Sequence, residues 1–310
     1  MAPDPGPERT PRCSLCGRPA VFRDRTSGRR SCREHFIAGL EERVAETIRS
    51  REMIRPGDHV AVALSGGKDS TALLMILSRF LPSWDSVRLT AITVDEGIRG
   101  YREDTIRSAD RQAVDFGIDH IHISFTELFG DSLDEILRGR EQEACSICGI
   151  LRRKAVITGA QRAGATRLAT GHNLDDEAQS VLMNVLRGDL ARLARDSGSD
   201  SGGRFIPRIK PLMLIPEREI AAYLVLRRAW SDLPECPYAR HALRGEVRAV
   251  LAAFESRHPG TMLHLLESKD EIARSGPGTI VGPIRRCREC GDPCSGGICQ
   301  PCRLLRSLGR

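Results

Sequence analysis

The middle of the chain alternates between short apolar runs and longer segments in which apolar residues recur every three or four positions. The apolar runs, which have the length and the β-branched content of strands, are residues 59–64, 88–97, 119–128 and 167–173. The segments with helical spacing are residues 69–81, 102–117, 151–164 and 174–188. This alternation predicts an α/β fold with a parallel sheet that is covered by helices on both faces.

Ligands of such sheets bind at the carboxyl ends of the strands, so the loops SGGKDS, VDEG and GHNLDD form the predicted site. In the first loop, Gly66 and Gly67 allow the backbone to approach an oxyanion closely. The helix that begins near Asp69 directs its free N–H groups and its positive dipole end toward that anion, and Lys68 adds a charge. The pattern predicts a phosphate or pyrophosphate ligand, and it differs from the Walker A loop.

The helix after GHN begins with three carboxylates, Asp175, Asp176 and Glu177. Such residues commonly compensate the helix dipole. Beside a phosphate loop on a neighbouring strand they can instead bind magnesium, and the residues alone leave both interpretations open. Lys210 lies in an apolar, proline-containing segment, RFIPRIKPLMLIPEREI, which we expect to cover this site or to pack against it.

The length of 310 residues allows one large domain or two. No apolar run approaches the roughly 18 residues that a membrane span needs, and the first twelve residues have the composition of a polar, disordered tail rather than of a signal peptide. We therefore expect a cytoplasmic protein without membrane contact. The net charge of +6, from 47 basic and 41 acidic residues, is compatible with nucleic-acid binding but does not require it.

Eleven cysteines divide into three groups, and in a cytosolic protein clustered cysteines are more often metal ligands than disulfides. Two groups have the paired spacing of tetrahedral zinc sites: Cys13, Cys16, Cys32 and His35, and then Cys287, Cys290, Cys299 and Cys302. Neither pattern leaves an open coordination position, so both predicted zinc sites are structural. Cys294 is left over between the pairs of the second group. Arginine-rich zinc modules often contact RNA, but zinc can equally serve only to fold a segment that is too small for a core.

The third cysteine group is incomplete as a zinc site. Cys145 and Cys148 form a C-x2-C pair in EACSICGILRRKAV, and Cys236 lies far away in PECPYARHALRGEV. Three cysteines fit a [4Fe-4S] cluster with three protein ligands and one open iron. They also fit a persulfide and disulfide pair that performs thiol exchange, or an ordinary C-x2-C pair with an unrelated core cysteine. The residues favour the cluster and leave the other two interpretations open.

The loop SGGKDS resembles the PP-loop of the N-type ATP pyrophosphatases, which adenylate a substrate and release pyrophosphate. Within that superfamily, CSICG, TGHNLDDEAQ, RIKPL and ECPY, framed by the two terminal cysteine groups, resemble the TtuA-type tRNA 2-thiouridine synthetases of the TtcA/TtuA tRNA thiolation family. The eukaryotic cytosolic wobble-uridine thiolases belong to the same family. The resemblance extends from Cys13 to Cys302 and so covers nearly the whole chain.

The resemblance implies an ATP-dependent tRNA-uridine 2-sulfurtransferase. The C2 oxygen of a tRNA uridine attacks the α-phosphate of ATP, and sulfur that is delivered through a [4Fe-4S] cluster on the third cysteine group then displaces AMP. The implied catalytic residues are Cys145, Cys148, Cys236, Asp175, Asp176 and Asp69, of which the aspartates act through Mg²⁺ or by positioning. The implied ATP-binding residues are Ala63, Leu64, Ser65, Gly66, Gly67, Lys68, Asp69, Ser70, Val94, Gly171 and Asp176, with the adenine near Val94 and Gly171.

The same resemblance implies the partners. These are tRNA, two Zn²⁺ ions, a second copy of the chain in a homodimer, and a sulfur donor that is either a ubiquitin-like carrier with a C-terminal thiocarboxylate or free sulfide. Synthesis of tRNA 2-thiocytidine and sulfur transfer to a small metabolite are the alternatives. An amide-forming ligase of the superfamily would not need the three cysteines, and a non-enzymatic zinc protein that binds RNA would not need the phosphate loop.

These features predict five parts along the chain. They are a disordered tail at 1–12, an N-terminal zinc ribbon at 13–38, a linker helix at 39–57, a PP-loop ATP pyrophosphatase catalytic domain of the adenine nucleotide alpha-hydrolase-like type at 58–270, and a C-terminal zinc ribbon at 280–310.

Overall fold

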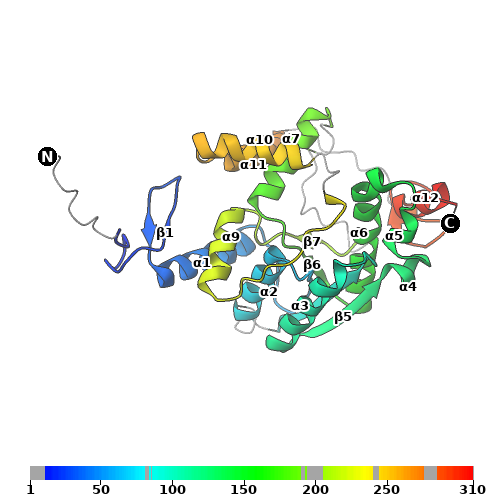
Figure 1. The fold of residues 1–310 in the computed structure, drawn as a ribbon, viewed down its shortest axis with the longest axis horizontal. Coiled ribbons are helices and arrows are strands. Elements are labelled where there is room, and N and C mark those ends of the chain that lie inside the picture. Colours follow the sequence, from blue (N-terminus) through cyan, green and yellow to red (C-terminus); the bar gives the residue numbers. More distant parts are fainter. Residues whose placement is uncertain are drawn as a thin grey trace.

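A parallel sheet of five strands forms the centre of the molecule in the computed structural model (Figure 1). The structure describes residues 11–80, 84, 86–189, 193, 205–239, 244–275 and 285–309, so most of the expected tail lies outside the described residues. In the order of the sheet, the strands are β5 (Asp119–Ser124), β4 (Arg88–Asp95), β3 (His59–Ala63), β6 (Arg167–Ala169) and β7 (Arg208–Ile209). All four pairings are parallel, so the carboxyl ends of the strands share one edge.

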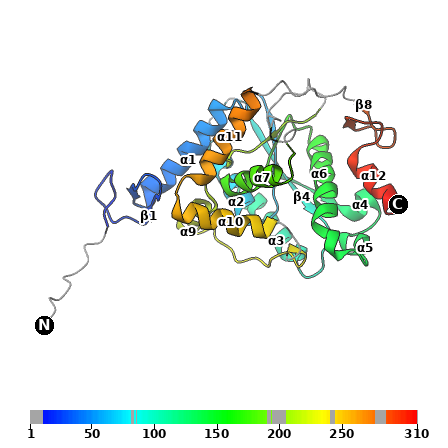
Figure 2. The same cartoon turned by 90° about the horizontal axis from the view of Figure 1, so that it is seen from above.

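Helices cover both faces of this sheet, as the alternation predicts. They are α1 (Arg33–Ser50), α2 (Lys68–Phe80), α3 (Arg102–Asp115), α4 (Phe125–Phe129), α5 (Leu133–Ile136), α6 (Ala144–Arg162), α7 (Leu174–Leu186), α9 (Glu217–Leu226), α10 (Arg244–Arg257), α11 (Thr261–Ser275) and α12 (Gln300–Ser307), with a 3-10 turn at Glu141–Glu143. Because side chains alternate along a strand, Val60 and Val62 join an apolar cluster with α1, α2, α7 and α9, whereas Ala61 joins a second cluster with α4, α5 and α6. Figure 2 shows α4, α5, α6 and α12 on one side and α1, α9, α10 and α11 on the other.

The predicted strands and helices of the middle region are confirmed, with three larger differences at their ends. Strand β6 ends at Ala169, four residues before the end of its predicted run at 167–173. Strand β5 ends at Ser124, four residues before the end of the apolar run, because the Ser124 hydroxyl accepts from the N–H of Glu127 and caps α4. Helix α6 begins at Ala144, before the C-x2-C pair rather than after it, so Cys145 and Cys148 lie in its first two turns. The preceding Glu143 makes no side-chain capping bond, and this start therefore lacks the usual sequence signal.

Two short antiparallel hairpins lie at opposite ends of the molecule (Figures 1 and 2). They pair β1 (Phe22–Arg23) with β2 (Arg30–Ser31), and β8 (Arg285–Arg286) with β9 (Pro293–Cys294). Each hairpin carries one of the terminal cysteine groups. The first continues directly into α1, which runs unbroken across residue 38. No helix within the described ranges combines the length and the apolar composition that a membrane span requires.

Helix α6 lies close against the sheet, and one glycine makes this approach possible. A Cβ added at Gly159 would lie 2.5 Å from Ile92 Cγ2 and 3.1 Å from Ile123 Cγ1. A Cβ added at Gly149 of the same helix would meet no atom within 4 Å in the part of the chain that the structure describes. Replacing each of the two glycines by alanine therefore separates the effect of packing from that of helix propensity.

We expect Gly159→Ala to destabilise the protein by about 1–3 kcal/mol, because the added methyl group must displace two strand side chains. Gly149→Ala should leave the free energy of unfolding unchanged or raise it by up to about 1 kcal/mol, because alanine is the better helix former. Urea unfolding followed by circular dichroism measures both variants. Equal effects of the two substitutions would contradict the close packing of α6.

Candidate functional site

The turn between β3 and α2 is confined by two glycine positions. Gly66 has a φ of +84°, and a Cβ there would lie 2.1 Å from the carbonyl oxygen of Thr105 in α3, so only glycine fits. Gly171, from the loop after β6, is also confined, because its Cβ would lie 2.9 Å from the carbonyl carbon of Asp69. The backbone of the SGGKDS turn is therefore held between α3 and the GHNLDD loop.

The hydroxyl groups of the turn hold its shape. Ser70 Oγ donates to the carbonyl oxygen of Gly67 at 2.9 Å and accepts from the N–H of Ser65 at 3.2 Å. The two serine Oγ atoms are 3.0 Å apart. Helix α2 begins at Lys68, so its first N–H groups lie at the carboxyl end of β3. This is the arrangement at which α/β proteins bind phosphate groups.

Lys68 lies between two carboxylates. Its Nζ is 2.8 Å from Asp69 Oδ2 and 2.7 Å from Glu217 Oε1, at the start of α9. Burial opposes the charge, but Asp69 and Glu217 outweigh it and raise the pKa of Lys68 above its ordinary value. The ammonium group therefore stays charged beside the turn, where a phosphate can compete with the carboxylates for it.

The start of α7 brings further carboxylates to the turn. Asn173 accepts from the N–H of Asp176 at 3.0 Å and donates from its amide to Asp69 Oδ1 at 3.0 Å. Asp175 accepts from the N–H of Glu217 at 2.7 Å. Burial raises the pKa of both Asp175 and Asp176, and a bound cation would relieve the cost of burying their charges. Asp69, Asp175 and Asp176 are not among the sets of described residues whose ligand atoms all lie within 4.8 Å of one another, so the structure gathers these carboxylates at the turn without closing them around one ion.

Cys145, Cys148 and Cys236 come together at the start of α6. Cys145 Sγ donates to the backbone carbonyl of Tyr238 at 3.7 Å, and Cys236 packs against the apolar cluster that contains Cys148. Burial raises the pKa of both helix thiols, to about 11 at Cys148, and Cys236 adds to the effect. The trio is not among the sets of described residues whose ligand atoms all lie within 4.8 Å of one another. At least one pair of its sulfur atoms is therefore farther apart than 4.8 Å.

Glu96 connects the thiol group to the turn. Its side chain is 2% exposed and lies 2.7 Å from Arg102 Nε and 2.5 Å from Arg152 Nε. Arg152 donates to Cys148 Sγ at 3.2 Å, and Arg102 donates to the carbonyl oxygen of Ser65 at 3.3 Å. One carboxylate therefore holds two arginines, each of which contacts a different part of the predicted site.

A cavity of about 170 Å³ lies beside the turn, between Ser65 and Arg152. Its lining residues are Ala63, Leu64, Ser65, Ile92, Val94, Glu96, Tyr101, Arg102, Arg152 and Val156. The first three and Val94 are predicted nucleotide-binding residues, whereas Arg152 contacts Cys148. None of the three cysteines lines the cavity, which reaches the thiol group only through Arg152.

Four residues of the site, Glu96, Arg102, Asn173 and Glu217, are not singled out by the sequence analysis. Glu96 and Asn173 lie in the VDEG and GHNLDD loops, so their position at the ends of strands was a usable signal. Arg102 and Glu217 begin helices, and nothing in their neighbouring sequence indicates which loops they contact.

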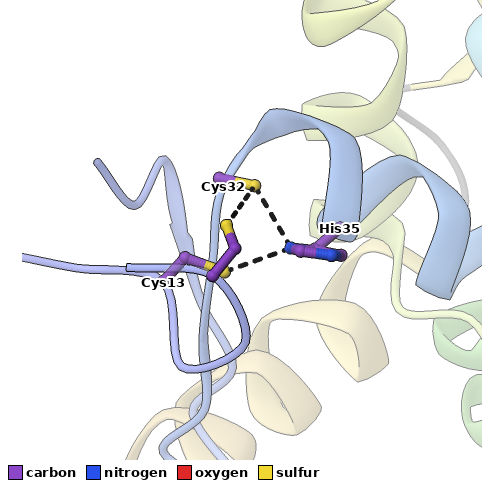
Figure 3. Close-up of side chains that lie close together, drawn as sticks. Cys13, Cys32 and His35 are labelled. Carbon is purple, nitrogen blue, oxygen red and sulfur yellow. Dashed lines mark hydrogen bonds between the residues drawn. The ribbon is translucent and has the colours of Figure 1, made fainter. Parts of the chain in front are cut away.

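The N-terminal cysteine group converges on one point. Its members are Cys13, Cys16, Cys32 and His35, whose ligand atoms all lie within 4.8 Å of one another. Cys13 Sγ and Cys32 Sγ each lie 3.4 Å from His35 Nδ1 (Figure 3), and Cys16 Sγ lies 3.7 Å from Cys32 Sγ. Tetrahedral ligands at the usual zinc bond lengths are about 3.5–3.8 Å apart, so this spacing fits a single tetrahedral ion.

The C-terminal cysteine group converges in the same way. Its members are Cys287, Cys290, Cys299 and Cys302, again within 4.8 Å of one another. Cys294 Sγ donates to the carbonyl oxygen of Gly296 at 2.8 Å and does not belong to the set. The group is attached to α6, because Lys154 of that helix forms an ion pair with Asp292 and the leucines of α12 pack on the same apolar cluster.

The segment around Lys210 packs against the start of α7. Lys210 Nζ lies 2.6 and 2.8 Å from the two carboxylate oxygens of Glu177, and the two side chains are 11% and 5% exposed. Burial alone would raise the pKa of Glu177, but the Lys210 charge outweighs it and holds that pKa below its ordinary value. Glu177 is therefore an ionised partner of Lys210 beneath the site.

Lys210→Met should lower the free energy of unfolding by about 3 kcal/mol at pH 7, because it leaves the Glu177 charge buried without a partner. Adding Glu177→Met should recover most of the loss, since two apolar side chains can replace a buried ion pair. Arg55→Met is the control, because the Arg55–Glu52 pair is exposed and should contribute less than about 1 kcal/mol. Guanidinium unfolding measures all three. A double variant that is no more stable than Lys210→Met would contradict this description of the pair.

The sequence and the fold are both similar to those of characterised proteins. Residues 38–250 match the PP-loop domain family. The chain is 36% identical to the tRNA 2-thiolation protein NcsA of Haloferax volcanii, over 96% of this chain and 98% of that protein. It is 38% identical to the cytoplasmic tRNA 2-thiolation protein 1 of Bos taurus, over 97% of this chain and 88% of that protein.

The fold gives the same result. The U34-tRNA thiolase NcsA from Methanococcus maripaludis, whose structure contains its [4Fe-4S] cluster, matches this structure with a TM-score of 0.84. The match has 32% sequence identity and covers 96% of this chain and 97% of that chain. The turn, the thiol group and the overall sequence agree, and the chain therefore belongs to the PP-loop family of tRNA 2-thiolation proteins.

Proposed function

We propose that this protein is an ATP-dependent tRNA 2-thiolase, which adenylates the C2 oxygen of a tRNA uridine and replaces it with sulfur that passes through the thiol group of Cys145, Cys148 and Cys236. The observation that carries the proposal is the cavity between the SGGKDS turn and Arg152, beside Cys148. Such a reaction needs the activated carbon and the incoming sulfur at one place. The names of the relatives, including a U34-tRNA thiolase, support uridine 34 of tRNA as the substrate.

The nucleotide half of the site is built from the turn and the loops beside it. The first N–H groups of α2 and the Lys68 ammonium bind the phosphates. Val94 and Gly171 flank the adenine. Asp69 and Asp176, which Asn173 already joins through two hydrogen bonds, hold Mg²⁺. Asp175, which is bonded to the backbone of α9, positions this group.

The chemistry then proceeds in two displacements. In the first, the C2 oxygen attacks the α-phosphorus, a P–O bond forms, pyrophosphate leaves, and the base loses its N3 proton. Lys68 stabilises the charge that develops on the leaving pyrophosphate. In the second, hydrosulfide adds to C2, the C2–O bond breaks, AMP leaves with the oxygen, and the S–H proton restores N3–H. Adenylation is needed because it converts a poor leaving group into AMP.

The three cysteines fit a [4Fe-4S] cluster better than a single zinc ion. Three thiols that are spaced more widely than the terminal quartets match a cluster in which one iron has no protein ligand. When bound, the cluster supplies that open iron as a binding position for sulfide. The chain's own contribution is to hold the thiols at the cavity and to place Arg152 beside Cys148 as a fixed positive charge, because an arginine cannot act as a base.

We infer the remaining components from what the family resemblance implies. The sulfur donor is a thiocarboxylated ubiquitin-like carrier or free sulfide, and the active form is a homodimer. The name of the bovine relative supports the cytoplasm as the compartment. Each terminal quartet holds one structural Zn²⁺, which the observed ligand spacing supports.

Deletion of the gene should remove 2-thiouridine at position 34, measured by mass spectrometry of nucleosides and of tRNA fragments. The wild-type gene should restore it. Lys68→Ala should reduce the restored level at least about tenfold, because it removes a charge that stabilises the leaving pyrophosphate. Arg274→Ala, which removes an exposed charge on α11, is the matched control and should restore the nucleoside fully.

Two results of this experiment would overturn the proposal. Loss of 2-thiocytidine in place of 2-thiouridine would assign the related cytidine reaction. Survival of every thionucleoside would make a small metabolite the sulfur acceptor.

Protein purified without oxygen should contain about four irons per chain. Cys236→Ala should lose the iron and the thiolation activity together, because it removes one of three ligands. Cys294→Ala should keep both, because Cys294 lies outside every cysteine group. Iron analysis and single-turnover thiolation measure the two effects. Full activity in iron-free wild-type protein would instead support the persulfide route.

A further inference from the structure

A separate group of metal-ligand side chains lies at the β5 edge of the sheet. His120 and His122 are two residues apart on this edge strand, so both project from the same face, and Asp110 reaches them from α3. His120 Nδ1 lies 3.3 Å and His122 Nε2 lies 3.0 Å from the same oxygen, Asp110 Oδ1. The three ligand atoms all lie within 4.8 Å of one another.

The hydrogen bonds of His120 fix which ring nitrogen carries the proton. Thr93, which is completely buried, donates its only hydroxyl hydrogen to the carbonyl oxygen of Leu64 at 2.7 Å. Its oxygen must therefore accept from His120 Nε2, which is 2.7 Å away. In the neutral ring, Nδ1 then presents a lone pair to the Asp110 carboxylate. Two electron-rich atoms at 3.3 Å repel each other unless a proton or a metal ion lies between them.

We propose that Asp110, His120 and His122 bind a divalent transition-metal ion. Ligands at zinc bond lengths of about 2.0–2.2 Å are themselves about 3.0–3.5 Å apart, which agrees with the two observed separations. Two imidazoles and one carboxylate suit zinc, nickel, copper or iron rather than calcium or magnesium. Thr93 plays the part of the outer partner that orients a metal-bound histidine.

The position of the three side chains allows an ion to enter from solvent, and it also indicates the structural role of that ion. The side chains of His122 and Asp110 are 48% and 45% exposed, so solvent reaches the site and can complete the coordination. A bound ion fastens α3 to β5 beside the SGGKDS turn. Helix α3 supplies the Thr105 carbonyl that confines Gly66, and Ser108 Oγ of the same helix donates to the Gly66 carbonyl at 3.4 Å. The metal thus stabilises the part of α3 that packs against the SGGKDS turn and takes no part in the thiolation itself.

Zinc content is the direct test. Full-length, untagged protein is dialysed against buffered micromolar Zn²⁺, and its zinc is determined by mass spectrometry. Wild-type protein should hold one zinc per chain more than His122→Ala or Asp110→Asn. His258→Ala, at an exposed histidine after α10, should match the wild type. Zinc on the cysteine groups is common to all four proteins and cancels in the difference. Added zinc should also raise the unfolding temperature of the wild type by more than that of either ligand variant.

Cobalt gives an independent signature of the ligands. The difference spectrum between Co²⁺-loaded wild-type protein and His122→Ala should show visible d–d bands without a thiolate charge-transfer band, because the proposed ligands are nitrogen and oxygen. Asp110→Asn conserves the shape of the side chain. It therefore shows whether a loss of zinc in His122→Ala comes from the lost ligand or from misfolding. Equal zinc contents in the wild type and both ligand variants, or a zinc that binds only at millimolar concentration, would show that the three side chains form an ion pair alone and would overturn the proposal.

Discussion

The buried carboxylate of Glu96 is the contact on which both halves of the proposed active site depend. It pairs with the buried Arg102 and with Arg152, whose side chain is half-exposed, so the group carries one negative and two positive charges. A buried carboxylate is costly without partners. The removal of either arginine would therefore leave the Glu96 charge less well compensated and the position of the remaining arginine less well supported. The excess positive charge borders the cavity beside the turn. Both ligands proposed there, a phosphate group and hydrosulfide, are anions, and an excess of positive charge at the cavity favours them.

The nucleotide half of the site has the complementary charge arrangement. Lys68 is held by Asp69 and Glu217, and Glu217 also pairs with Arg248 at 2.6 Å. In the proposed reaction a nucleotide with Mg²⁺ would bring both signs of charge at once, so its phosphates would replace the carboxylates at Lys68 while the metal would replace Lys68 at the carboxylates. The side chains are therefore already placed, and little reorganisation is required when the substrate binds.

The sequence predicts those parts of the site whose residues lie close together along the chain. The SGGKDS turn, the strand before it and the helix after it lie within about twenty residues, and the glycine, hydroxyl and lysine pattern indicates a phosphate site by itself. Cys236 lies ninety-one residues after Cys145, so the residues alone favoured the grouping of the three cysteines but left two other interpretations open, and the family resemblance then implied it. The contacts of Glu96 are invisible in sequence, because they depend on where β4 and α6 meet in the sheet. The early start of α6 was missed for a related reason: its first turn is fixed by packing and not by a capping side chain.

The C-terminal cysteine quartet belongs to a small module that is attached to α6. A segment of this size has little core of its own, so the proposed zinc ion would supply much of its folding energy. It contacts α6 through the pair of Lys154 with Asp292 and through Leu304, Leu305 and Leu308, on the helix whose first turns carry Cys145 and Cys148. Gly159, toward the other end of that helix, allows it to approach the sheet closely. Helix α6 is thus held between the sheet and the C-terminal cysteine module, and a helix held on both sides keeps its two thiols at a fixed position relative to the turn.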